Sequence, residues 1–326
     1  MVALRDPALT RSRGYVASAW RRFRQNNLAV AGLIVFVVML LFAYGAPLLS
    51  RYVTHQSYAA QNIVHTFAKP GETVTGIDFA STSGQPVTRS HWLGSDELGR
   101  DVLTRLAYGG RISVTVAFMT MALALTFGLL IGASAGYYGG AVDGLLMRAV
   151  DIVLSIPGLF LLILISAMVN NNVTLAKSRV FHDSGWLVLP IIIAAVSWTG
   201  LSRLVRGEFL ALRNREFVDA ARVIGASNFR IIWRHIMPNV AHVVVIWTTL
   251  IIPTVILSEA SLSYLGFGVA IPTPSWGNML TNATQYFAQS PYLVIVPGAA
   301  IYVTVLSVHL MGNGLRDALD PRLNAQ

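Results

Sequence analysis

The sequence predicts an all-α, polytopic membrane bundle of about six transmembrane helices. Of its 326 residues, 54% are hydrophobic and 12% are charged, whereas soluble domains carry about 25% charged residues. Long apolar stretches recur along the chain, and arginine gathers beside some of them and not others. The first two observations give the fold class, and the third orients the chain in its membrane.

Each candidate span is close to the roughly 20 residues that cross a bilayer as a helix. The fourth is the shortest. Several contain proline, which membrane helices tolerate when neighbouring groups satisfy the freed carbonyls, so we expect kinks. In order, the candidates are residues 28–49, 112–136, 150–169, 186–202, 240–262 and 292–312.

The arginines predict that both termini are cytoplasmic. Six arginines precede the first span, seven lie between the fourth and fifth spans, and two follow the sixth. The opposite short loops hold only Lys177 and Arg179. Because Lys and Arg of short loops stay in the cytoplasm, we place the chain in a cell membrane with the loop 203–239 inside.

Five units follow from this topology. They are a basic cytoplasmic segment, an uncleaved first span, a long extracytoplasmic loop, a core of five spans and a cytoplasmic tail. A cleaved signal peptide would have an apolar region of only about 7–15 residues. The units are residues 1–27, 28–49, 50–111, 112–312 and 313–326.

Two local patterns predict further structure. Ser95, followed by acidic residues, predicts an N-cap and an amphipathic helix near 95–108 at the outer membrane interface. Gly128, Gly132 and Gly136 recur every fourth residue. Such a stripe lets a second helix approach closely, so it predicts tight packing within the bundle.

The cytoplasmic loop is predicted to contain two short helices joined by a glycine. Asn214 is a candidate N-cap for the first helix, which carries acidic residues in its first turn. Gly225 follows in the position of a left-handed C′ residue. Ser227 can cap the second helix, which ends near Pro238. A basic amphipathic segment lying on the anionic inner leaflet is the alternative interpretation.

The loop resembles the signature loop of permeases of ATP-binding-cassette (ABC) importers. The pattern is an acidic residue with two alanines, three residues, a glycine, nine residues and a terminal Ile-x-Leu-Pro, in which His235 and Met237 replace Ile and Leu here. The resemblance implies a coupling helix that docks on a cytoplasmic ATPase. The residues assigned to this docking loop are Glu216, Asp219, Ala220, Ala221, Gly225, Ala226, Arg230 and Pro238.

Other segments narrow the resemblance to the C-type permease subunit of dipeptide and oligopeptide ABC importers. The segments are residues 91–113, 197–218, 265–280 and 311–323. Departures are Asn313, where the family has aspartate, and a longer polar insertion around 52–90. The resemblance implies peptide import. Related members carry glutathione, nickel complexes or oligosaccharides, and these substrates remain alternatives.

The same resemblance implies the partners. They are a second homologous permease, one or two cytoplasmic ABC ATPase subunits, an extracytoplasmic peptide-binding protein and the lipid bilayer. ATP and magnesium would bind the ATPase subunits, and this chain would hold no cofactor.

Several activities are excluded on residues alone. The sequence has no cysteine and no Gly-Lys-Ser/Thr P-loop, so we expect neither a thiolate metal site nor ATP hydrolysis. The net charge of +9 lies beside apolar spans and does not predict a nucleic-acid partner.

Three charged residues lie in or near apolar spans, where charges are rare and often functional. Arg148 and Asp151 are three residues apart and predict a structural ion pair on one helix. Glu259, near the outer end of the fifth span, is a candidate for the translocation path or for the outer interface.

An ATP-independent secondary transporter is the alternative from another class. It would need coupling-ion carboxylates or broken helices near the middle of the membrane, often with inverted repeats. No convincing repeat is present, and the acidic residues lie near span ends.

Overall fold

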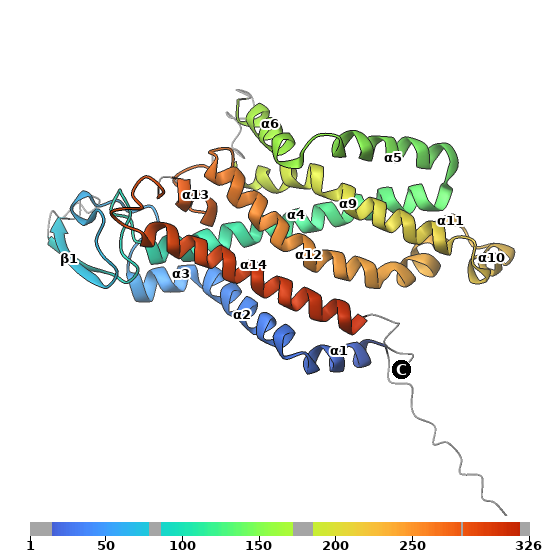
Figure 1. The fold of residues 1–326 in the computed structure, drawn as a ribbon, viewed down its shortest axis with the longest axis horizontal. Helices are drawn as coiled ribbons and strands as arrows, with labels where there is room; N and C mark the ends of the chain where they lie inside the picture. Colours follow the sequence, from blue (N-terminus) through green and yellow to red (C-terminus); the bar gives the residue numbers. More distant parts are fainter. Residues whose placement is uncertain (1–14, 78–85, 172–184, 282, 320–326) are drawn as a thin grey trace, which may run out of the picture.

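Five long apolar helices form the body of the protein. The computed structural model describes residues 15–77, 86–171, 185–281 and 283–319. Within them, five helical stretches are long and apolar enough to cross a membrane. Their main helices are α2 (Asn27–Tyr44), α4 (Val102–Tyr138), α9 (Val188–Leu212), α12 (Met237–Tyr264) and α14 (Tyr292–Leu319). They run along the length of the molecule in Figure 1, and the predicted all-α membrane bundle is confirmed.

Helix α4 contacts three of the other long helices, α2, α9 and α12. Helix α14 packs against α2 and α12. The most extensive helix–helix contact is between α4 and α9. A Cβ added at Gly132 would lie 2.5 Å from the Ser202 carbonyl oxygen, and one at Gly136 would lie 2.5 Å from the Phe209 Cβ. Tight packing through the glycine stripe is therefore confirmed.

The predicted third span, residues 150–169, is not one helix. Two helices, α5 (Gly140–Leu154) and α6 (Gly158–Asn170), meet there at an angle of 87°. Pro157 lies at the break, lacks a backbone N–H and disfavours helical conformation in the residue before it. The described residues thus hold five spans, or up to six if the bent pair counts as one.

The end of the molecule at the left of Figure 1 is a small subdomain that includes two strands, which the sequence did not predict. Strands β1 (Glu72–Ile77) and β2 (Pro86–His91) pair antiparallel. The short helices before them are α3 (Ala46–Leu49), η1 (Ser50–Thr54) and η2 (Ile63–His65).

A buried polar chain joins this subdomain to α4. His65 Nδ1 lies 3.0 Å from His91 Nε2, and His91 Nδ1 lies 3.2 Å from an Asp101 carboxylate oxygen. The other Asp101 oxygen accepts hydrogen bonds from the backbone N–H and the hydroxyl of Thr104.

The helix predicted near 95–108 begins later than expected. Asp101, not Ser95, is the N-cap, and α4 starts at Val102. The Ser95 hydroxyl instead donates to the His65 carbonyl and accepts from the Ala68 N–H. Contacts with a distant segment therefore outweigh the local capping pattern.

The opposite end carries α1 (Tyr15–Gln25) and the elements α10 (Glu216–Val223), α11 (Asn228–Arg230) and η4 (Ile231–Ile236), which leads into α12. Two short elements remain, η3 (Gly185–Leu187) before α9 and α13 (Trp276–Thr281) before α14. Because α14 continues to Leu319, residues 313–319 are helical, and the rest of the predicted tail lies outside the described residues.

Candidate functional site

The segment 216–236 forms the predicted helix–glycine–helix turn, which we call the elbow. Gly225 has φ +79°, in the left-handed region that favours glycine, so this prediction is confirmed. Ser227 caps α11 by accepting a hydrogen bond from the Arg230 N–H at 3.4 Å. The predicted cap at Asn214 is wrong, because Arg215 precedes α10 and makes no side-chain cap bond.

One side of the elbow packs against the bundle. Val218 and Ala221 of α10 are buried with Ile231, Ile232 and Ile236 of the following segment. This cluster includes Leu201, Val205 and Phe209 of α9. The elbow is therefore anchored to the membrane bundle by apolar contacts.

The other side of the elbow exposes large apolar residues. Val223 is 87% exposed, Ile224 81% and Phe229 73%. Val223 and Ile224 directly precede Gly225, and Phe229 follows it by four residues; α10 lies at the tip of the molecule in Figure 1. Apolar side chains this exposed and this close together mark an interaction surface.

The remaining predicted loop residues are distributed over both sides. Ala220 is exposed whereas Ala221 is buried, so the two alanines do not share one bare face. Asp219 pairs with Arg222 at 3.0 Å. Ala226 packs against the buried cluster. The exposed residues Glu216, Arg230 and Pro238 complete the predicted set.

Tyr137 connects the elbow to the end of α4. Its hydroxyl donates to Asn228 Oδ1 at 2.8 Å, and the Arg222 guanidinium lies 5.9 Å from its ring centroid. Asn228 and Arg222 lie on opposite sides of Gly225. Nothing in the sequence pattern singles out Tyr137, because a tyrosine at the end of an apolar span is common at membrane interfaces.

Two ion pairs attach α5 to α9. Arg206 binds Asp143 through two nitrogens, at 2.5 and 2.6 Å, and Arg203 binds Asp151 at 2.6 Å. The predicted Arg148–Asp151 pair is wrong, because Asp151 takes its partner from α9 and no ion pair of Arg148 is found among the described residues.

Glu259 is completely buried, so it reaches neither an open translocation path nor the outer interface in this conformation. One carboxylate oxygen accepts from the Ser113 hydroxyl of α4 and the other from the Ser263 hydroxyl of α12, each at 2.7 Å. Ser113 Oγ in turn accepts a hydrogen bond from the backbone N–H of Trp276, and Ser263 Oγ accepts one from the backbone N–H of Val269. Glu259 thus orders the loop that follows α12.

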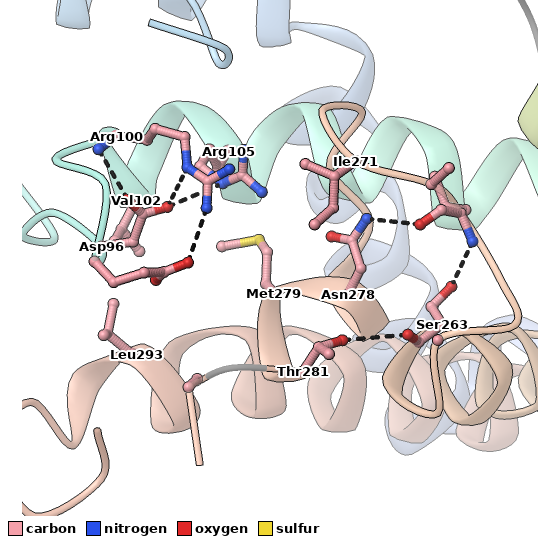
Figure 2. Close-up of a pocket in the computed structure, with 15 residues that line it drawn as sticks. Asp96, Arg100, Val102, Arg105, Ser263, Ile271, Asn278, Met279, Thr281 and Leu293 are labelled. Atoms are coloured by element: carbon pink, nitrogen blue, oxygen red, sulfur yellow. Dashed lines mark hydrogen bonds and ion pairs between the residues drawn. The ribbon is translucent and has the colours of Figure 1, made fainter. Parts of the chain in front are cut away.

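A pocket of about 220 Å³ lies between the outer loop and α13. Figure 2 shows Asp96 between Arg100 and Arg105 at one end of it and Asn278 at the other. Asp96 lies 2.6 Å from Arg100 Nε and 3.5 Å from Arg105 Nε. These opposite charges satisfy one another and hold the outer loop on α4. Among the described residues, no three His, Asp or Glu side chains are arranged to hold a metal ion.

Comparison with known proteins identifies two family models. Residues 128–325 match the model described as binding-protein-dependent transport system inner membrane component. Residues 14–70 match the N-terminal TM domain of oligopeptide transport permease C. The first match contains the elbow, and the second contains α1 and α2.

Curated relatives cover nearly the whole chain. The oligopeptide transport system permease protein OppC of Escherichia coli K12 is 38% identical over 93% of this chain and 90% of its own. The dipeptide transport system permease protein DppC of Alkalihalophilus pseudofirmus is 36% identical over 94% and 90%.

A solved structure shares the fold. A chain of the inward-facing MetNI methionine ABC transporter aligns with a TM-score of 0.51 and 17% identity, covering 66% of this chain and 96% of that one. At this identity the likeness concerns architecture alone.

Proposed function

Since the chain belongs to the binding-protein-dependent transport system inner membrane components, we propose that it forms the translocation path of an ATP-driven importer for dipeptides or oligopeptides. The family is a non-catalytic membrane component of ABC importers, and ATP is used by partner ATPases. What is proposed for this chain is its cargo, its partners and the surface on which an ATPase docks.

The observation that carries the proposal is the elbow. It presents Val223, Ile224 and Phe229 to solvent while its other side is fixed on α9. An apolar tip on an anchored support can fill a groove on an ATPase and pass a displacement to the membrane helices. Contacts that differ between ATP-bound and ATP-free states would then shift the balance between inward-open and outward-open forms.

Orientation follows from charge. The arginine-rich segments, which include α1 and the elbow, would face the cytoplasm. The β1–β2 subdomain would then face outward, where a peptide-binding protein delivers its cargo. A second permease chain would complete the path, with one or two ATPase subunits on the cytoplasmic side.

Peptide cargo is supported by the names of the relatives, which are oligopeptide and dipeptide permeases. Glutathione, nickel complexes and oligosaccharides remain the cargoes to compare with peptides. Uptake into proteoliposomes that contain the full importer and its binding protein distinguishes these classes directly.

The test of the docking surface is co-purification. We would express the tagged chain with its permease and ATPase partners and substitute Val223→Asp and Ile224→Asp together. Both side chains are largely exposed, so the fold should persist while the charged tip no longer enters an apolar groove. We expect the double variant to lose the ATPases.

A matched control is Ile63→Asp, which charges an equally exposed apolar residue, 78% accessible, in the β1–β2 subdomain. This variant should retain the ATPases. Retention of ATPases by the Val223/Ile224 variant, or ATP-independent transport by the purified chain alone, would contradict the proposal.

A further inference from the structure

A large apolar groove lies between α1 and the bundle and is not used by the proposed function. Its volume is about 700 Å³, within the roughly 300–1,000 Å³ typical of ligand-binding clefts. Trp20 and Phe23 of α1 line it together with Leu33 of α2. The opposite wall contains Ala241 and Val245 of α12 and Leu315 of α14, and the described residues that line it include no Asp or Glu.

The groove lies at the membrane boundary. Its walls come from the first turns of α12, the last turns of α14 and the first half of α2, all of them candidate spans. In Figure 1, α1 turns away from α2 and lies along the end of α14. Helix α1 is amphipathic, with Ala19 and Phe23 buried and Arg21 and Arg24 exposed, as in helices that lie in the headgroup region.

No arginine is among the described residues that line this groove, but several are next to lining residues in the sequence. Arg21, Arg22 and Arg24 occupy three of the last five positions of α1. Arg24 follows Trp20 by four residues, so both lie on one side of the helix. Arg316, in the last turn of α14, directly follows the lining residue Leu315. Basic pockets between membrane helices on the cytoplasmic side bind anionic phospholipid headgroups.

We propose that the groove is a binding site for an anionic phospholipid, with acyl chain against Trp20, Val245 and Leu315 and with headgroup phosphate at Arg24 and Arg316. Lipid acyl chains can fill an apolar groove at the membrane boundary at little cost in free energy. The neighbouring arginines favour a negatively charged headgroup over a zwitterionic one. Because Pro238, Ala241 and Val245 begin α12 directly after η4, the lipid would support the helix that leaves the elbow.

The experiment measures which lipid the intact importer retains. We would incubate the purified complex with equal amounts of palmitoyl-oleoyl phosphatidylglycerol and phosphatidylcholine and count bound lipids by native mass spectrometry. Wild type should retain phosphatidylglycerol. Ala241→Trp, which fills the groove, should lose it, whereas Ala141→Trp, at an exposed alanine of α5, should retain it.

Charge is tested separately, because a tryptophan could disturb α12. Replacing Arg24 and Arg316 by Gln should lower the preference for phosphatidylglycerol by roughly fivefold for each arginine removed. Replacing Arg51 and Arg148 by Gln removes the same charge from exposed positions that neither line the groove nor neighbour a lining residue, and should leave the preference unchanged.

A photo-crosslinking residue at Val245, 41% exposed, identifies the occupant. A mass increase of one phospholipid supports the proposal. A cross-link to the second permease chain instead would overturn it, as would equal lipid retention by Ala241→Trp and wild type. Neither result bears on ATPase docking, which is measured by co-purification.

Discussion

The hydroxyl of Tyr137 donates a hydrogen bond to Oδ1 of Asn228 at 2.8 Å, and this contact joins the end of α4 to the far side of the Gly225 turn. The Tyr137 ring also faces Arg222 on the near side. One side chain thus touches both helices of the elbow. A displacement of the elbow would therefore also shift the end of α4, in addition to α12.

Tyr137→Phe should weaken the coupling between ATP hydrolysis and transport. It removes one hydrogen bond, worth about 1 kcal/mol, and keeps the ring contact with Arg222. We expect ATPase subunits to remain bound while less cargo is moved per ATP hydrolysed in proteoliposomes. Tyr138→Phe is the control, since Tyr138 is exposed. An unchanged ratio in Tyr137→Phe would show that the contact has no part in coupling.

The two ion pairs that attach α5 to α9 differ in burial, so removing them should destabilise the protein by different amounts. Asp143→Asn should destabilise the protein by about 1–2 kcal/mol, because Arg206 loses a bidentate, partly buried partner. Asp151→Asn should cost less than about 1 kcal/mol, because the Arg203–Asp151 side chains are 51% and 59% exposed. Thermal unfolding of both variants in detergent makes the comparison, and equal losses would contradict it.

Glycine-to-alanine substitution should have opposite effects on stability at Gly132, inside the glycine stripe, and at Gly144, outside it. Gly132→Ala places a Cβ 2.5 Å from the Ser202 backbone oxygen and must push α9 away, at a cost of about 1–3 kcal/mol. Gly144→Ala meets nothing within 4 Å and should stabilise α5 by up to about 1 kcal/mol. Melting temperatures of the two variants should therefore move in opposite directions.

Features governed by local pattern were predictable from the sequence. Apolar length predicted five of the spans, and four-residue spacing predicted a close helix contact at the glycine stripe, although not that its partner is α9. The absence of a Cβ explains why Gly225 can turn the elbow. Features that depend on contacts between segments far apart in the sequence were not predictable in this way. Asp151 has a local cation three residues away but pairs with Arg203, 52 residues away.

The same distinction explains three other differences between prediction and structure. Ser95 fits a helix cap, yet it is held by His65 and Ala68, which no local pattern connects to it. Pro157 lies in the predicted third span, but a proline alone does not specify whether a membrane helix bends or breaks. Contacts with neighbouring segments determine which of the two occurs. The burial of Glu259 was not predictable either, because one of its serine donors, Ser113, is 146 residues away.

Glu259 leads to the last prediction, which separates a structural carboxylate from a transport residue. Glu259→Ala should destabilise the protein by at least about 3 kcal/mol, because it leaves a cavity and removes the acceptor of two buried hydroxyls. Glu259→Gln keeps the shape but points an amide donor at a serine hydroxyl that already donates, so it should cost about 1–3 kcal/mol.

The measurement pairs thermal unfolding with uptake of peptide into proteoliposomes, and Glu208→Gln, on α9, is the control. If Glu259 acts by ordering the loop 265–276, transport should fall in proportion to the loss of stability, and cooling should restore it. A Glu259→Gln protein of wild-type stability that transports no peptide would contradict this, and would mean that the carboxylate is uncovered in another conformation of the transport cycle.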